Sequence, residues 1–224
     1  MAKLVWDKAG EKRYETGLDH GVLYVAKDEG GYDTGVVWNG LTAVTESPSG
    51  AEESAIYADN IKYLSLRSTE EFGATIEAYS SPEEFDVCDG QATIKEGVTI
   101  GQQKRKRFCF SYRTKKGTDE NDDAGYIIHI IYNATASPTE KAYNTINDNP
   151  EAITMSWEVS TIPVEVTGFK PTAHIEIDST KVKPAALTKI EAALYGADQS
   201  GADQSGTPKV LLPDEIVAII TAAA

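Results

Sequence analysis

Apolar and polar positions alternate along several short stretches of this chain. A period of two residues is typical of a half-buried β-strand. The pattern predicts strands at residues 22–25, 74–79, 154–159 and 174–178. Because such stretches dominate, we expect a mainly β fold.

One stretch, residues 126–132, is apolar at almost every position, and His129 is the exception. A strand that is apolar on both faces is typical of one covered on both sides. We therefore expect its covering to come from a second sheet and a helix, or from a neighbouring subunit.

Two segments carry helix signals instead. Residues 184–195 place Leu187, Ile190 and Leu194 on one face, with Gly196 at the expected C-terminal cap. This pattern predicts a helix lying on a sheet. A second, short helix is predicted after Ser81, where proline in the first turn and Glu84 complete a capping box.

The segment 36–63 contains many turn residues and is too long for an ordinary hairpin loop. Structureless connections beyond about 12–15 residues are uncommon unless they are functional. The segment nevertheless keeps several large apolar side chains. We predict an arm over about residues 39–60 that buries these side chains against a second copy of the protein, with residues 47–50 as the bend at its tip.

A basic run, Lys104, Arg105, Lys106 and Arg107, is predicted to open a strand. Basic residues followed by aromatic ones can indicate nucleic-acid binding. Successive side chains of a strand point to opposite faces, however, so these four cations do not form one continuous surface. We favour ion pairs with acidic groups on a partner strand or a neighbouring subunit.

The pentapeptide at residues 196–200 is repeated without change at 201–205. Its composition is typical of a flexible linker. We expect one β domain over residues 1–195, followed by a linker and C-terminal tail over 196–224. The end of that tail, from Val210, is expected to form a short helix or strand.

The balance of 21 basic and 35 acidic residues in 224 gives a formal charge of −14. This charge disfavours binding to nucleic acid or to an anionic membrane surface. No apolar run approaches the ~20 residues of a membrane helix, and no signal peptide is expected. Cys88 and Cys109 are predicted to be reduced, buried thiols.

No catalytic constellation stands out. The three histidines, His20, His129 and His174, are far apart and lack the short spacings typical of metal ligands. We interpret His129 as an interior residue and His174 as a solvent-side one. Adjacent glutamates, such as Glu52 and Glu53, do not face each other on a helix or a strand. We therefore expect no enzymatic activity, no metal and no cofactor.

Several short motifs, none of them catalytic, follow one another in a characteristic order and spacing. They include residues 14–17, 21–24, 38–41, 47–52, 57–60, 62–63, 81–85, 88–90, 108–114, 129–133, 137–138 and 156–158. Together these motifs resemble the major tail tube proteins of long-tailed bacteriophages, and the resemblance extends from Trp6 to about Tyr195.

The resemblance implies a β-sandwich or partly closed barrel with a flanking α-helix and a long inter-ring loop. It implies homohexameric rings, stacked into a tube that delivers the phage genome to the host without binding DNA specifically. The implied partners are other copies of the chain and the tail terminator, baseplate or tip, and tape-measure proteins. The implied location is the virion, after synthesis in the host cytoplasm. The residues matching the ring-stacking arm are Trp38, Asn39, Leu41, Thr42, Val44, Glu46, Ser47, Pro48, Gly50, Glu52, Ile56 and Tyr57.

Two alternatives remain open. One is the tube protein of a phage-derived contractile injection system, which would share the fold. The other is a carbohydrate-binding β-sandwich of a phage tip, because 11 tyrosines and 3 tryptophans could form a sugar platform. For a tube that passes DNA, we expect mainly Asp and Glu toward the lumen, since a basic lumen would retain the polymer. We also expect a chain lacking residues 42–56 to fold without polymerising.

Overall fold

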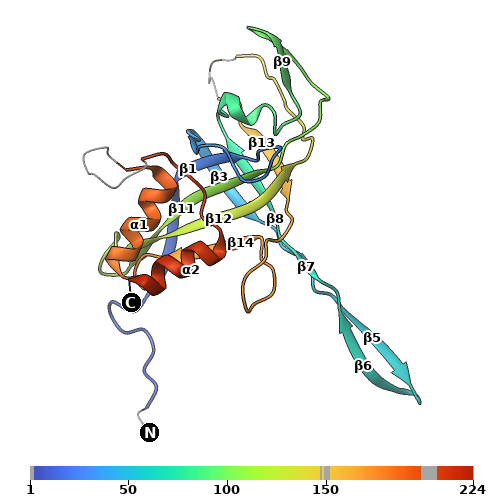
Figure 1. Ribbon diagram of the computed structural model, residues 1–224. Coiled ribbons are helices and arrows are strands. Elements are labelled where there is room, and N and C mark those ends of the chain that lie inside the picture. The colour runs from blue at the N-terminus through green and yellow to red at the C-terminus, as the bar shows by residue number, and fades with distance from the viewer. Residues whose placement is uncertain (1–2, 147, 149–151, 198–205, 224) are drawn as a thin grey trace.

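The computed structural model describes residues 3–146, 148, 152–197 and 206–223. Its body is a large antiparallel sheet with two helices on one side, and a long hairpin projects away from it (Figure 1).

The large sheet has the strand order β2-β1-β11-β12-β13-β8-β3, and β14 pairs with β12. All of its pairings are antiparallel. The long strand β12 pairs with β11 along one edge, and along the other first with β14 and then with β13. The bounds are β1 Arg13–Val25, β2 Val36–Val37, β3 Leu41–Glu46, β8 Gly73–Ala78, β11 Phe108–Thr118, β12 Gly125–Ala136, β13 Met155–Ser160 and β14 His174–Asp178.

The described part of the chain also forms three small two-stranded sheets. They are β4 (Ser49–Gly50) with β7 (Glu70–Glu71), β5 (Glu53–Ala58) with β6 (Ile61–Arg67), and β9 (Ala92–Lys95) with β10 (Val98–Ile100).

One core lies between the two halves of the large sheet. Trp38 and Phe85 pack there against Trp157, with ring centroids 5.4 and 5.2 Å from its ring, respectively. Phe110 of β11 reaches the same cluster, 5.3 Å from Trp38. Since β11 and β13 contribute to one core, the sheet folds over on itself, which is the layered arrangement expected of a β-sandwich.

A second core lies on the outer face of the sheet, beneath the helices. Tyr24, Ile128 and Tyr132 of the sheet are fully buried there with Ile190 and Leu194. Tyr24 donates a hydrogen bond to the carbonyl of Leu194, at 2.7 Å. The apolar strand 126–132 is therefore covered on both faces, as predicted, because Ile131 belongs to the first core.

The predicted helix is confirmed as α1, Pro184–Tyr195, with Ile190 and Leu194 buried and Gly196 following at φ +86°. A second helix, α2 (Pro213–Ala222), buries Ile216 in the same core. The C-terminal tail therefore ends in a docked helix. Most of the repeated pentapeptide, where a flexible linker was predicted, lies outside the described residues.

The capping box predicted after Ser81 is wrong. The segment forms one 3-10 turn, η1 (Glu83–Phe85), whose N-cap is Pro82 without a side-chain hydrogen bond. Packing of Phe85 in the first core, rather than helix capping, holds this turn in place.

The mainly β fold class and the strands predicted by alternation are confirmed. The outer layer, however, has two helices rather than one. Cys88 and Cys109 are buried and unpaired, as predicted. Among the described residues, none of the helices has the length and apolarity needed to cross a membrane.

Candidate assembly surface

The hairpin that projects from the body is longer than the predicted arm and begins later. Residues 41–46 form β3 and belong to the large sheet, where they pair with β8. The projecting part, residues 47–72, is a ribbon built from β4, β5, β6 and β7, and we call it the arm (Figure 1). The long connection is therefore mostly paired strand.

The tip of the arm is the turn at Asp59 and Asn60. Both residues have positive φ, 52° and 64°, which is the conformation of a two-residue hairpin turn. The prediction that residues 47–50 form the tip is wrong. Ser49 and Gly50 pair with Glu71 and Glu70 close to the body, so they form the root.

The arm has two unlike faces. Ile56 lies opposite Leu64, Ser54 opposite Leu66, and Ala58 opposite Ile61. Residues directly opposite in an antiparallel pair share a face, so these six side chains form one side of the ribbon. We call the large ones, Ile56, Ile61, Leu64 and Leu66, the apolar face.

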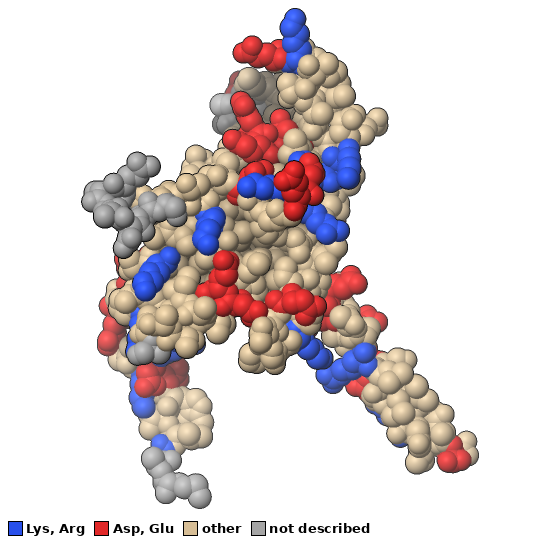
Figure 2. Space-filling view, in the orientation of Figure 1, with Lys and Arg blue, Asp and Glu red and all other residues tan. Residues whose placement is uncertain are grey.

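The opposite side carries polar groups. Glu53 accepts hydrogen bonds from Lys62 and from Ser65, and it lies opposite Arg67. Tyr57, which is 70% exposed, lies opposite Lys62 and therefore shares this side. We call the polar members, Glu53, Lys62, Ser65 and Arg67, the polar face. Figure 2 shows the outer part of the arm as mostly uncharged, with basic side chains nearer its root.

No other described residue covers the apolar face. Ile56, Ile61, Leu64 and Leu66 expose 41%, 65%, 38% and 55% of their surface, respectively. An isolated two-stranded hairpin is at best marginally stable in water. Covering this face would be favourable. Fully burying a side chain of this size contributes roughly 1.5–3 kcal/mol of free energy relative to leaving it exposed.

The predicted arm residues fall into separate groups. Trp38 is buried in the first core, and its Nε1 donates to the carbonyl of Ser80 at 2.8 Å. Leu41 and Val44 pack against that core. The remaining predicted residues are exposed: Asn39, Thr42, Glu46, Ser47, Pro48, Gly50, Glu52, Ile56 and Tyr57.

Sequence reasoning missed three of the four large residues of the apolar face. Ile61, Leu64 and Leu66 lie on the returning strand β6, beyond the predicted end of the arm. The alternation of Leu64 and Leu66 with Ser65 was a usable signal for a strand.

The basic run lies before β11 and not inside it, because the strand begins at Phe108. Arg105 Nη1 lies 3.2 Å from Asp89 Oδ1, and Lys106 Nζ lies 3.1 Å from Asp28 Oδ2. These two cations are thus paired within the chain, while Lys104 and Arg107 are exposed. Burial opposes ionisation of Asp89, but hydrogen bonds from Lys141, Gln91 and Arg105 outweigh it and keep its pKa low.

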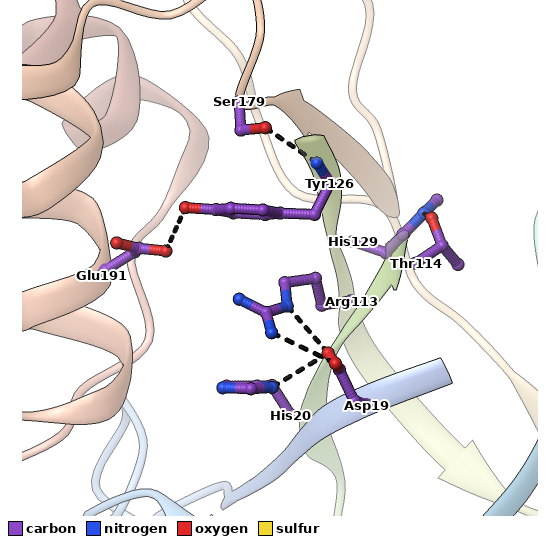
Figure 3. Close-up of polar contacts among 8 residues, drawn as sticks. All are labelled: Asp19, His20, Arg113, Thr114, Tyr126, His129, Ser179 and Glu191. Carbon is purple, nitrogen blue, oxygen red and sulfur yellow. Dashed lines mark hydrogen bonds and ion pairs between the residues drawn. The ribbon is translucent and has the colours of Figure 1, made fainter. Parts of the chain in front are cut away.

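A polar network fastens α1 to the sheet (Figure 3). Arg113 of β11 donates to both carboxylate oxygens of Asp19, at 2.7 and 3.1 Å. The same guanidinium lies over the ring of Tyr126, 4.5 Å from its centroid. Tyr126 in turn donates to Glu191 of α1, at 2.6 Å. These contacts fasten α1 to the large sheet, and none of them involves a residue of the arm.

The histidines are arranged differently from the sequence expectation. His129 is interior, as predicted, but the His174 side chain is only 13% exposed, so the solvent-side interpretation is wrong. Strands β12 and β14 bring the two rings together, with Nδ1 of His129 3.3 Å from Nε2 of His174. Glu46, at the end of β3, completes a group of three.

No protein-family model matches the chain, and no curated protein sequence does. Among solved structures, one similar chain comes from the PVC sheath–tube complex of an extracellular contractile injection system in its extended state, determined by cryo-electron microscopy. The identity is 12%, the TM-score is 0.31, and the match covers 71% of this chain and 88% of that one. At this TM-score, the similarity assigns no function to the chain.

Proposed function

We propose that this chain is the subunit of a tube in a phage tail or a tail-like injection assembly, and that the arm joins one copy to the next. The observation that supports this proposal best is the apolar face of the arm, which projects from the body and is left exposed by the part of the chain that the structure describes.

A second copy of the chain is the partner we infer, because further uncovered apolar groups lie elsewhere on the same molecule. Val37 on the edge strand β2 is 63% exposed, and Ile94 on β9 is 67% exposed. An arm that docks on a different surface of the next copy makes a heterologous contact. Such contacts build rings or filaments when they repeat.

Strand edges offer a second means of joining subunits. β2 and β3 end the large sheet, and β14 pairs only with β12 among the described strands. Open strand edges pair with other chains unless they are covered. Edge pairing within a ring, together with arm docking between rings, would produce the stacked hexamers that the sequence resemblance implies.

The net negative charge of the chain favours a tube through which DNA passes over a protein that binds DNA. With 35 acidic and 21 basic residues, a tube built from it would repel phosphate wherever the excess faces the lumen. Screening over roughly 10 Å restricts this effect to the vicinity of the wall. We therefore expect the lumen to be lined mainly by Asp and Glu.

The second candidate is the tube of a phage-derived contractile injection system. The similar structure reported above belongs to an assembly of that class, although its TM-score does not choose between the two tubes. Genes for a contractile sheath or an effector beside this gene would favour the injection system. Tail terminator and tape-measure genes without a sheath would favour a siphovirus-type tail.

A carbohydrate-binding role has less support. Trp38 and Trp157 are buried in the first core, and Trp6 alone of the three tryptophans is exposed. Two of the three tryptophans are therefore not available at the surface to stack on sugar rings.

Negative-stain electron microscopy of the purified chain tests the proposal directly. We expect rings or tubes that grow with protein concentration. A chain that stays monomeric at every concentration and binds immobilised glycans would overturn the tube assignment.

A further inference from the structure

We propose that Glu46, His129 and His174 form a binding site for a divalent transition-metal ion of the zinc class, at the root of the arm. The three residues come from β3, β12 and β14. They lie 83 and 45 positions apart in sequence and meet only in the folded chain.

The three ligand atoms form a nearly equilateral triangle. His129 Nδ1 lies 3.3 Å from His174 Nε2, and Glu46 Oε1 lies 3.5 Å from each nitrogen. In a tetrahedral site, metal–ligand bonds of about 2.0–2.2 Å place the ligand atoms ~3.3–3.6 Å apart. The spacing therefore fits one ion bound by three protein ligands, with the fourth position left to water.

The same spacing is long for hydrogen bonding among the three groups. The contact of His129 with His174 is a hydrogen bond of 3.3 Å, and Glu46 Oε1 lies 3.5 Å from each nitrogen, beyond the range of about 2.7–3.2 Å that is typical of N–H···O bonds. Two imidazoles and one carboxylate are also the donor set found in zinc sites that keep an open position.

Neighbouring side chains orient the ligands from outside the triangle. Thr114 Oγ1 lies 3.0 Å from Nε2 of His129, leaving Nδ1 to face the other two ligands (Figure 3 shows Thr114 beside His129). Tyr112 donates a hydrogen bond to Glu46 Oε1, at 2.6 Å, and its ring stacks on His129. Metal-binding histidines typically have such a partner on the second nitrogen.

An ion can reach the site from solvent. The Glu46 side chain is 33% exposed, and His174 lines a surface hollow of about 770 Å³ together with Glu15 and Glu176. The residues that would hold the ion are otherwise well packed, with the ring of Phe72 stacked on His174 at 4.7 Å.

The position of the site has a structural consequence. Glu46 ends β3 immediately before the arm, and Phe72 is the last residue of the arm. An ion bound here would tie the root of the arm to β12 and β14, so metal binding would restrict where the arm points. Metal binding and tube formation are separate claims, and either can fail without the other.

The test uses the full chain, purified without a polyhistidine tag, stripped with a chelator and titrated with Zn²⁺ and with Co²⁺. We expect one ion per chain, a Co²⁺ absorption spectrum of low coordination number, and a melting temperature that rises with free Zn²⁺, since a ligand that binds only the folded state stabilises it. Glu46→Gln and His174→Gln should each weaken binding at least about tenfold, the scale seen when metal sites lose a supporting group.

His20→Gln is the matched control, because His20 is the one remaining histidine and its contact is with Asp19 instead. This variant should bind like the native chain. Failure of the native chain to bind either ion, or equal losses in the His20 and His174 variants, would overturn the proposal. If His174→Gln does not fold, the zinc affinity of Glu46→Gln tests the proposal, because the Glu46 side chain is partly exposed and its replacement disturbs the core less.

Discussion

Ile56 and Leu64 lie directly opposite each other across β5 and β6, and both remain exposed, at 41% and 38%. Such a pair normally gains its stability from a covered face. Here the residues that the structure describes leave the face uncovered. The pair thus belongs to the surface through which we expect the arm to bind the next copy of the chain.

Removing the arm should abolish assembly and preserve the body. Deleting residues 42–56 would not be a clean test, because it removes most of β3 from the large sheet. We instead predict the outcome for a chain in which residues 49–71 are replaced by Asn-Gly. Ser47 already donates to the carbonyl of Gly73 at 2.8 Å, so the strands can be closed there. Circular dichroism and light scattering should show a folded monomer, and normal tubes from this chain would exclude a role for the arm.

The two faces of the arm should respond differently to substitution. Ile56→Ser with Leu66→Ser should prevent or weaken assembly, while the free energy of unfolding of the monomer changes by less than about 0.5 kcal/mol, as is usual for exposed positions. The matched control, Lys62→Ser with Arg67→Ser, alters the polar face and should assemble. Sedimentation velocity over a concentration series distinguishes the two pairs, and equal behaviour would contradict the assignment of the faces.

Stability should depend on pH through Asp19. Hydrogen bonds from Arg113 hold the pKa of Asp19 below its ordinary value of 3.8. A lowered folded-state pKa contributes stability above the unfolded value, and this contribution is lost as pH falls through the folded value. Asp19→Asn should therefore lower the free energy of unfolding by about 1–2 kcal/mol at pH 7, and its difference from the native chain should shrink below about pH 4.

Urea denaturation at pH 7 and pH 3 measures this difference. Asp33→Asn is the control, because the pair of Asp33 with Lys27 is exposed and 3.8 Å long; exposed pairs contribute about 0–1 kcal/mol. A pH-independent loss in Asp19→Asn would show that the carboxylate charge is not the cause.

The two thiols should be unreactive in the folded chain. Burial raises the pKa of Cys88 and of Cys109 to about 12, and only the thiolate attacks disulfide reagents. At pH 8, an aromatic disulfide reagent should label neither cysteine under native conditions and both after denaturation. Rapid labelling of the native chain would contradict the burial of these groups.

Local patterns in the sequence determined much of the fold. Alternation located strands such as β13, and the 3.6-residue period with Gly196 located α1, because both signals depend only on neighbours along the chain. The apolar run through Ile128 and Ile131 also indicated that β12 is covered on both faces. The capping box after Ser81 failed because the packing of Phe85 in the core outweighed a local preference.

The features that depend on strand register, namely the form of the arm and the meeting of distant side chains, were visible only in the tertiary structure. Whether the long connection was a loop or a ribbon depended on the pairing of Ile56 with Leu64, which alternation alone does not specify. Trp38 looked like an arm residue and is a core residue, because the sheet folds over it. His129 and His174 met Glu46 only through the pairing of β12 with β14 and the end of β3. Sequence spacing carries no information about such a meeting, since register between distant strands is set by the whole packed sheet.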